Sequence, residues 1–368
     1  MAVQYHYGEF PPEELDWKRL IPVIGPASMA VARYDGTLSA VPNASLLLSP
    51  LITQEAVLSS RIEGTQTTMG EVLEYEAEGE SKAIEPGKKA DIQEVLNYRR
   101  ALNRSVEMMR DLPLCQRIIR EAHRVLLDGV RGQGKDPGEY RKNQNWIGPH
   151  GCTLEEARFV PISPDRLPDG MSAWERHIHA GAQDHLVRLA VLHAEFEALH
   201  PFHDGNGRLG RMMVPLYMYE KGLISGPMFY ISAYFEAHRD EYYERLLAVS
   251  REGAWTEWCL FFLEAVRQQA EENRSKAQAI LDLYEGMKPR FTEITRSQHA
   301  ISALDRIFSH PIFNSGNFIE ASGIPVATAR RILRELREHD VLEVLLESSG
   351  RRSAVYVFPE LLRITEGR

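Results

Sequence analysis

The stretch HPFHDGNGRLGR, from His200 to Arg211, constrains this chain more than any other part of its sequence. The residues before and after it have helical periodicity, so the stretch reads as a short loop that joins two helices. Arg208 and Arg211 then fall at the start of the second helix, where the positive dipole end disfavours a cation by some tenths of a kcal/mol up to about 1 kcal/mol. We therefore expect an anion to be bound at this helix end.

The loop itself has the composition of an anion-binding loop. Gly205 and Gly207 flank Asn206, and glycines allow backbone N–H groups to turn inwards and approach a ligand closely. The guanidinium groups of Arg208 and Arg211 share one side of the helix and match phosphate geometry. A plain helix–turn–helix corner would explain the Asn-Gly turn but not the two arginines. We expect a nucleotide-like polyphosphate here, although no GxxxxGK[ST] loop is present.

Asp204 is a carboxylate beside this phosphate site, and a bridging cation would resolve the repulsion. Mg²⁺ is the usual bridge, because it is held by one carboxylate together with phosphate oxygens. The alternative is a zinc site that combines Asp204 with His193, His200 and His203. This alternative uses neither the glycines nor the arginines and lacks an HExxH pattern.

His200 ends the apolar face of the helix that precedes the loop. A histidine near neutral pKa at this place could act as a general base and take the proton of a protein hydroxyl that attacks a phosphate. A hydrogen-bonded core histidine is the structural alternative. The face is formed by residues at spacings of three and four: Leu186, Leu189, His193, Phe196 and His200.

The stretch resembles the signature HxFx[DE]GNGRxxR of the Fic (filamentation induced by cAMP) family at every defined position. The resemblance implies a protein adenylyltransferase, which transfers AMP from ATP to a Ser, Thr or Tyr hydroxyl of a target protein and releases diphosphate. It implies that His200 is the general base, that Asp204 binds Mg²⁺ and that Phe202 anchors the loop. Gly207 favours AMP transfer over phosphate transfer. The implied phosphate-binding residues are Gly205, Asn206, Gly207, Arg208 and Arg211.

Two further stretches extend the resemblance. NQNWIG and ARFVPIS predict a β-hairpin, which resembles the family's flap, the element that registers a target segment by strand addition. Ile147 in this flap would lie near the nucleotide. YYERL resembles the region that contacts adenine and makes Tyr242 and Tyr243 candidate contacts, although two aromatic residues on a helix are more often part of a core.

SSRIEG, from Ser59 to Gly64, contains an acid in the opposite situation to that of Arg208 and Arg211. Apolar spacing predicts a helix that Gly64 ends, and Glu63 then lies at the negative end of that helix, where it needs a cation. An exposed surface glutamate is the alternative. The stretch resembles the family's inhibitory pattern [ST]xxxE[GN], in which Glu63 would pair with Arg211 and block the ATP γ-phosphate, with Ser59 on the same face. We expect an enzyme that restrains itself.

The C-terminal residues have their own pattern. A helix at Ala300–Phe308, two helices at Asn317–Ala321 and Val326–Glu338, and strands at Leu342–Leu346 and Ala354–Phe358 predict a winged helix. Its basic side chains make DNA a candidate partner, whereas interleaved acids favour a module that docks on protein. The candidate DNA contacts are Arg330, Arg331, Arg334, Arg337, Arg351 and Arg352.

These patterns predict a mainly α-helical fold: a Fic helical core with a β-hairpin flap, followed by a winged-helix domain. Residues 1 to about 45 read as an irregular arm with one helical candidate at Ser28–Arg33, and the polar stretch 285–296 reads as a linker. The predicted division is an N-terminal arm with inhibitory helix (1–89), the Fic core (90–284), the linker (285–296) and the winged helix (297–368).

Composition limits the remaining classes. A net charge of −9 argues against a chain that coats nucleic acid or membrane over its whole surface. Three separate cysteines, Cys115, Cys152 and Cys259, favour free thiols in a reducing cytoplasm. No signal peptide and no run of about 18 apolar residues is present, so a cytoplasmic protein without a membrane partner is expected.

Two alternatives to AMP transfer stay open. The same site, with Glu63 orienting water, would remove AMP from a target, as some relatives with the inhibitory glutamate do. A transcription regulator that senses nucleotide would act through the winged helix, although sensing does not need His200. The target could be another protein or the chain itself, and the resemblance suggests a homodimer.

Overall fold

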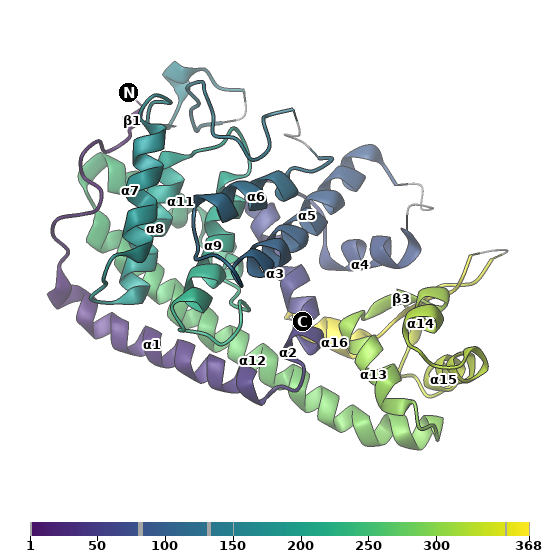
Figure 1. Cartoon of the computed structure of the whole chain (residues 1–368). Helices are drawn as coiled ribbons and strands as arrows, with labels where there is room; N and C mark the ends of the chain where they lie inside the picture. Colours follow the sequence, from purple (N-terminus) through teal and green to yellow (C-terminus); the bar gives the residue numbers. More distant parts are fainter. Residues whose placement is uncertain (1, 80–83, 131–133, 150, 350–351, 368) are drawn as a thin grey trace. The chain divides into compact units, whose positions relative to one another are not determined.

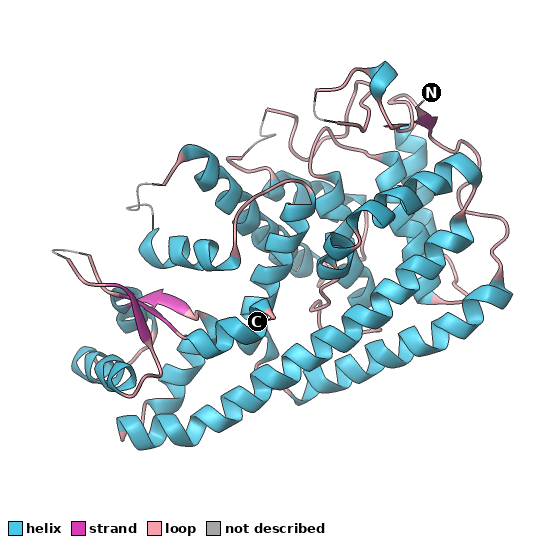
Figure 2. Cartoon of the chain, turned by 180° about the vertical axis from the view of Figure 1, so that it is seen from behind, coloured by secondary structure: helices cyan, strands magenta, loops and turns pink. Residues whose placement is uncertain are grey.

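Helices make up most of the described chain and its strands are short (Figure 2). This computed structural model describes the chain except residues 1, 80–83, 131–133, 150, 350–351 and 368 (Figure 1). The α-helices are α1 (Trp17–Ala40), α2 (Ala44–Leu47), α3 (Ser49–Ile62), α4 (Met69–Glu78), α5 (Pro86–Met108), α6 (Gln116–Leu126), α7 (Leu167–His179), α8 (His185–Leu199), α9 (Asn206–Glu220), α10 (Ser232–Ala237), α11 (Arg239–Glu252), α12 (Trp255–Thr295), α13 (Ala300–Ser309), α14 (Ser315–Ala321), α15 (Val326–Glu338) and α16 (Pro359–Glu366). The strands are β1 (Val3–Gln4), β2 (Phe159–Val160), β3 (Ile312–Asn314), β4 (Glu343–Leu346) and β5 (Val355–Val357).

The mainly helical fold predicted from the sequence is confirmed. None of the described helices is both long and apolar enough to cross a membrane. Packing divides the chain into two units that alternate along the sequence. The first unit comprises Met1–Asp35, Leu58–Gly64 and Asn97–Glu271, and the second comprises Gly36–Val57, Thr65–Leu96 and Glu272–Arg368. The predicted division assumed continuous segments, whereas each unit is built from separated stretches.

Helix α8 forms the centre of the first unit. The Asp184 side chain caps it by accepting from the backbone N–H groups of Leu186 and Val187, both at 2.9 Å. The indole N–H groups of Trp174 and Trp258 bond to its carbonyls from two sides. The helix is buried on almost every side, as expected of an apolar helix at the centre of a bundle. This burial holds the end of α8, and with it the motif, in a fixed place.

Helix α1 corrects the prediction of an irregular N-terminal arm. The helix runs from Trp17 to Ala40 and contains Pro22 and Pro26, which remove helical hydrogen bonds and led us to expect irregular structure. Its apolar residues recur at helical spacing, and Leu20, Ala27, Val31 and Tyr34 are buried. Burial of this stripe outweighs the penalty of the two prolines.

The segment 285–296, predicted as a linker, is also helical up to Thr295, the last residue of α12. Met287, Phe291 and Thr295 are buried at intervals of four residues. The surrounding residues are polar, so the stripe is too sparse to be recognised in the sequence. Tertiary burial of these few side chains extends the helix.

The second unit contains the elements of the predicted winged helix. Helix α13, strand β3, helices α14 and α15, and the hairpin β4–β5 follow in that order, and the sheet has the order β3-β5-β4. This agrees with a winged helix, with β3 as a strand that the sequence did not reveal. Helix α4 packs on β3 and β5, and the Asn314 amide bonds to the Ala77 carbonyl.

The predicted flap hairpin is present in reduced form. Ile147 and Phe159 make a single antiparallel bridge, and Phe159 belongs to β2. Strand β1, from the N-terminus, pairs in parallel with β2. The sequence predicted two strands in the flap and did not predict this third one.

Candidate functional site

His200 ends α8 in a left-handed conformation, with φ 46°, and Gly205 has φ 75° just before α9 begins at Asn206. The motif is therefore a tight loop between two helices, as predicted. A left-handed residue other than glycine is unfavourable by roughly 1–2 kcal/mol, so other contacts must hold His200 in place.

Arg141 supplies those contacts. Its Nε atom donates to the His200 carbonyl at 3.0 Å and its Nη2 atom donates to the Leu199 carbonyl at 3.3 Å. Its backbone N–H donates to the Pro201 carbonyl at 3.0 Å. These are carbonyls that the end of α8 leaves without helical partners, and a cation at this end also complements the helix dipole. Sequence reasoning did not single out Arg141.

His200 is a neutral base in this environment. Burial lowers its pKa to about 4, and the positive charge of Arg141 acts in the same direction. Its Nδ1 atom is buried without a hydrogen-bond partner among the described residues. An imidazole in this state has a lone pair available for a proton at neutral pH.

Asn206 closes the loop. Its Oδ1 atom accepts from the Phe202 N–H and its Nδ2 atom donates to the Phe202 carbonyl, both at 2.9 Å. The side-chain amide thus closes the loop with one acceptor and one of its two N–H donors. Phe202 is fully buried, in agreement with the anchoring role that the resemblance implied.

His123 on α6 holds the same loop from the other side. Its ring stacks on Phe202 with centroids 3.8 Å apart. Nδ1 accepts from the Gly138 N–H at 2.7 Å, so Nε2 carries the proton and donates to the Asp204 carbonyl at 3.1 Å. Burial lowers the pKa of His123 to about 4. No sequence pattern indicated this role, apart from a histidine in an otherwise apolar helix face.

Asp204 has cationic partners in the structure. Its Oδ1 atom lies 3.3 Å from Arg208 Nη2, and its Oδ2 atom lies 3.1 Å from Lys135 Nζ. Burial alone would raise the pKa of Asp204, but Arg208 and Lys135 outweigh it and hold the pKa below its usual range. Lys135 was not predicted as a site residue.

Arg211 pairs with Glu63 as the inhibitory pattern implied. Nη2 of Arg211 lies 2.7 Å from Glu63 Oε1, and its Nε donates to Ser59 Oγ at 2.9 Å. Nη2 also donates to the Ser59 carbonyl at 2.7 Å. The guanidinium is 1% exposed, and Glu63 raises its pKa even though burial acts against this. The two charges that lie at the wrong ends of their own helices thus neutralise each other.

Gly207 leaves the space that Glu63 fills. A Cβ atom at Gly207 would collide with Glu63 Oε1 and lie 3.0 Å from Arg211 Nη1. The carboxylate therefore sits at the N-terminal turn of α9, where the helix favours an anion. The expected anion is present as a side chain of the chain itself. Arg208 and Arg211 have separate partners here, rather than one shared anion.

The two candidate tyrosines have different surroundings. Tyr242 is buried and its hydroxyl bonds to His193 Nε2 at 3.0 Å, so it belongs to the core. Tyr243 is 38% exposed and donates to the Ile62 carbonyl at 3.3 Å, next to Glu63. Tyr243 thus contacts the end of α3 that precedes Glu63.

Glu197 is a further buried acid that the sequence analysis did not use. Burial raises its pKa to about 8, and its Oε1 atom has no hydrogen-bond partner in the described part of the chain, with His193 Nε2 4.0 Å away. A Cβ atom at Gly210 would collide with this carboxyl, and Arg211 and Glu63 both act on its charge. It is the second carboxyl in the surroundings of Arg211.

The zinc alternative does not fit the geometry. His193 donates from Nδ1 to the Gly210 carbonyl at 3.1 Å and accepts from Tyr242 at Nε2, so neither nitrogen is left for a metal. Within the described ranges, no three His, Cys, Asp or Glu side chains converge on a metal-sized site. Asp204 alone, with phosphate oxygens, still has the donor chemistry that Mg²⁺ uses.

His200 Nδ1 is one of several buried polar atoms of the described residues that have no hydrogen bond. Buried polar atoms are normally paired, so a ligand at the motif would satisfy this one. The N-terminal turn of α9 and the Asp204 carboxylate beside it have the donor chemistry that a nucleotide with Mg²⁺ would need. Ile147, the candidate contact in the flap, is 37% exposed.

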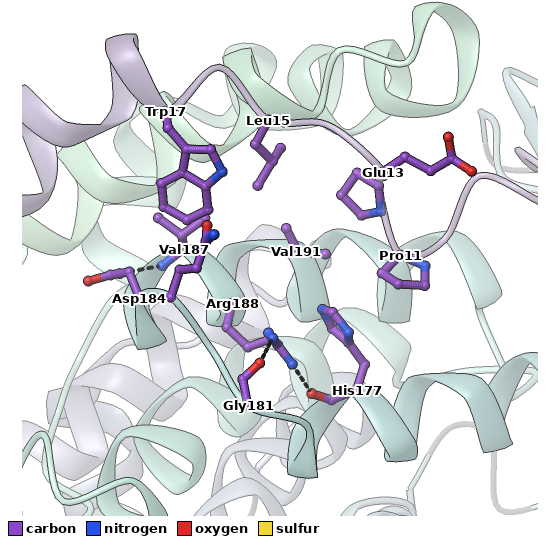
Figure 3. Close-up of a pocket in the computed structure, with 12 residues that line it drawn as sticks. Pro11, Glu13, Leu15, Trp17, His177, Gly181, Asp184, Val187, Arg188 and Val191 are labelled. Atoms are coloured by element: carbon purple, nitrogen blue, oxygen red, sulfur yellow. Dashed lines mark hydrogen bonds between the residues drawn. The ribbon is translucent and has the colours of Figure 1, made fainter.

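A pocket of about 240 Å³ lies elsewhere, between the N-terminal arm and helices α7 and α8 (Figure 3). Trp17 closes one side, and the Arg188 guanidinium opposite it donates to the carbonyls of His177 and Gly181. Asp184 is used as the cap of α8. Arg188 and Asp184 are thus committed within the protein, and no motif residue lines this pocket. We therefore place the functional site at the motif.

Comparison with known families shows to which family the chain belongs. A family model described as "Fic/DOC family N-terminal" matches residues 21–107, and one described as "Fic/DOC family" matches residues 113–218. Together they cover just over half of the chain and include Glu63 and the whole motif. The chain belongs to the Fic/DOC family. This confirms the resemblance on which the sequence analysis relied.

Curated proteins that are similar to this Fic protein are named protein adenylyltransferases. "Protein adenylyltransferase fic-1" of Caenorhabditis briggsae is 28% identical over 121 residues, which are 29% of this chain and 22% of the relative. "Protein adenylyltransferase Fic" of Culex quinquefasciatus is 32% identical over 139 residues, which are 36% and 24%. The matched region thus spans about a quarter of the length of these two relatives.

Solved structures show the same fold. A Fic family protein from Desulfovibrio desulfuricans G20 matches with a TM-score of 0.61 and 20% identity, over 95% of this chain and 98% of that one. Fic-1 (residues 134–508) from C. elegans matches with a TM-score of 0.55 and 19% identity, over 74% and 76%. At these identities the likeness concerns the fold alone.

Proposed function

We propose that this Fic protein transfers AMP from ATP to a Ser, Thr or Tyr hydroxyl of a target protein, and that Glu63 restrains the transfer. The relatives named protein adenylyltransferase support AMP transfer at the level of the family. The observation that carries the proposal is the Glu63–Arg211 pair at the N-terminus of α9, beside a histidine held neutral. The loop thus places a base beside an anion site, and Glu63, from the end of α3, occupies that anion site.

In the proposed reaction, His200 takes the proton of the target hydroxyl. The hydroxyl oxygen forms a bond to the α-phosphorus of ATP while the bond to the β-phosphate bridging oxygen breaks, and diphosphate leaves. General base catalysis of this kind contributes about 10²- to 10⁴-fold. Bound Mg²⁺ would neutralise phosphate charge, and Asp204 would hold it. The N–H groups at the start of α9 and the guanidinium of Arg208 would orient the phosphates.

The brake follows from competition for Arg211. A phosphate needs the same guanidinium and the same space above Gly207 that the Glu63 carboxylate occupies. Ser59 adds two hydrogen bonds to Arg211, and Tyr243 bonds to the carbonyl before Glu63. Release of the brake requires Glu63 to leave, while Ser59 can keep Arg211 oriented.

The test uses α-labelled ATP with Mg²⁺ and reads label on protein in lysate and on the chain itself. We expect little label with the wild type and a rise of about tenfold or more with Glu63→Gly, which removes the carboxylate from the anion site. A smaller rise is expected with Ser59→Ala, which removes only the Oγ bond to Arg211 and keeps the backbone carbonyl bond. Arg61→Ala, in the same turn of α3, is the matched control. Glu63→Gly/His200→Ala should lose about 10²-fold or more relative to Glu63→Gly.

Three outcomes would contradict the proposal. Equal labelling by wild type and Glu63→Gly would refute the brake. If no variant labels any protein, but the wild type removes AMP from a labelled target, the site acts in the opposite direction. Nucleotide binding with neither reaction would favour the sensing role.

A further inference from the structure

The N-terminal residues Val3–Tyr7 pair with the flap. Val3 lies opposite Phe159 and Gln4 opposite Val160 in a parallel ladder. The backbone N–H of Val3 donates to the Arg158 carbonyl at 2.9 Å, and that of Tyr5 donates to the Val160 carbonyl at 3.0 Å. Because Phe159 also pairs with Ile147, both edges of β2 are used.

Strands of two residues are too short to hold themselves in place, so the side chains must anchor this segment. The Tyr5 hydroxyl donates to Glu195 Oε1 at 2.7 Å, and His6 Nε2 lies 2.8 Å from Glu195 Oε2. His6 Nδ1 bonds to Ser250 Oγ at 2.7 Å. The side chains of His6 and Glu195 are fully buried.

Glu195 belongs to α8, the helix that ends at His200. Loss of the partners of a buried carboxylate strongly destabilises a protein, so Tyr5 and His6 are held firmly against this helix. Burial raises the pKa of Glu195, while the hydrogen bonds from His6 and Tyr5 favour its charged form. The anchor of the N-terminal segment is thus a side chain of the helix that presents the base.

Tyr7 holds the chain beyond β2. Its hydroxyl accepts from the Ser163 N–H at 2.8 Å, and the Arg166 guanidinium lies 5.4 Å from its ring centroid. The segment therefore contacts the flap strand and the residues that follow it. It precedes residue 21, where the family match begins.

We propose that Val3–Tyr7 is a positioning strap, which ties the flap to α8 and thereby fixes the flap relative to His200. A terminal segment that served only general stability would pack on the core alone, whereas this one supplies a third strand to the flap. If the flap registers a target segment, an idea that rests on the proposed function, the strap affects use of the target and leaves nucleotide binding unchanged. With both edges of β2 taken, a target strand must use the edge that carries Ile147.

Hydrogen exchange tests the strap without nucleotide or target. The amides to follow are Ile147, Arg158 and Phe159, which donate across the flap bridge at 2.9, 2.8 and 3.1 Å. In Tyr5→Phe/His6→Ala we expect them to exchange about tenfold faster, while Leu209 in α9 is unchanged. Glu14→Ala, an exposed residue of the same arm, is the control and should change neither. Unchanged flap amides in the double variant would overturn the proposal.

Tyr7→Phe gives a second, milder variant, because Tyr7 is 45% exposed and its loss leaves the core intact. It should speed exchange of the Ser163 amide, whose acceptor is removed, with the melting temperature unchanged. No change at Ser163 would contradict the role of Tyr7 in the strap. This measurement remains valid if the double variant fails to fold.

The functional arm uses the Glu63→Gly background. Adding Tyr5→Phe/His6→Ala should lower label transfer from α-labelled ATP several-fold, while the affinity for fluorescent ADP with Mg²⁺ stays within about twofold, because the strap contacts the flap and not the phosphate loop. A rise in transfer would mean that the strap competes with the target strand, and would overturn the proposal. If Glu63→Gly itself transfers no label, the proposed function fails, but the exchange result still decides the strap.

Discussion

His200 illustrates how an environment prepares a single residue for its chemistry. The imidazole is placed at the end of a buried helix, with a left-handed backbone, next to a guanidinium that bonds its carbonyl. Burial and this charge both disfavour the protonated form. A base that stays neutral needs no deprotonation before it can act, and this property follows from position rather than from the type of residue.

The pH dependence of transfer tests this view of His200. A histidine with a lowered pKa remains neutral until the pH falls to about 4, whereas an ordinary one is half protonated near pH 6.5. We expect the rate of Glu63→Gly at saturating ATP to stay nearly constant from pH 8 to about pH 5 and to fall below that. Loss of half the rate near pH 6.5 would show that the base is exposed and unperturbed.

At the scale of the element, the end of α8 depends on one side chain from outside the helix. Arg141 bonds to the carbonyls of Leu199, His200, Asn143 and Ile162. A lysine offers a point charge and no planar fork, so it could not reach all four acceptors. The shape of the motif loop thus relies on a residue from the segment that leads into the flap.

We expect Arg141→Gln to lower the free energy of unfolding by about 3 kcal/mol, because it leaves several buried carbonyls unpaired. It should also raise the pKa of His200, since the positive charge that lowers it is removed. Urea unfolding and the pH profile of transfer would measure the two effects. Lys142→Gln, the exposed neighbour, is the matched control, and an equal loss of stability in both variants would contradict the capping role.

Two helices show how local propensity yields to packing. Helix α1 includes two prolines, and the end of α12 reads as a polar linker, yet buried stripes make both helical. Propensity is a weak prior that tertiary contacts often override. The predicted helices α8 and α15 were correct because their apolar residues are densely spaced. The burial that stabilises them can therefore be recognised from neighbouring residues in the sequence.

At the scale of the whole molecule, DNA as the partner of the predicted winged helix stays a prediction. Arg331 is used within the protein, where it donates to Thr295 and Glu335, and Arg334 lies 3.8 Å from Glu338. Arg330 and Arg337 are exposed. Arg351 lies outside the described residues. The basic face is therefore smaller than the sequence suggested.

We expect the full chain to bind duplex DNA weakly, with a Kd of about 10⁻⁴–10⁻⁶ M that rises with salt, because contacts to phosphate release counterions. Fluorescence anisotropy with a labelled duplex would measure this. Arg330→Glu/Arg337→Glu should weaken binding about tenfold or more, while Arg331→Gln should not. Absence of binding at low salt would leave the winged helix as a protein-docking module.

The sequence by itself determined the family and the loop between two helices, and it singled out His200, Asp204, Arg211 and Glu63 as candidate site residues, because these belong to contiguous patterns with local meaning. It also indicated that Glu63 and Arg211 each need an opposite charge nearby, because each lies at the end of a helix whose dipole disfavours its charge. In both cases the physical information lies within a few residues of the chain.

Only the tertiary structure decided which residues make the site work. Arg141, His123, Lys135, Glu197 and Tyr5–Tyr7 act on the motif or its helix across long stretches of sequence. None of them belongs to a periodic pattern that differs from an ordinary core or surface. Their roles arise from unpaired backbone carbonyls and buried charges, which exist only once the chain is folded, and whose pairing therefore cannot be read from neighbouring residues.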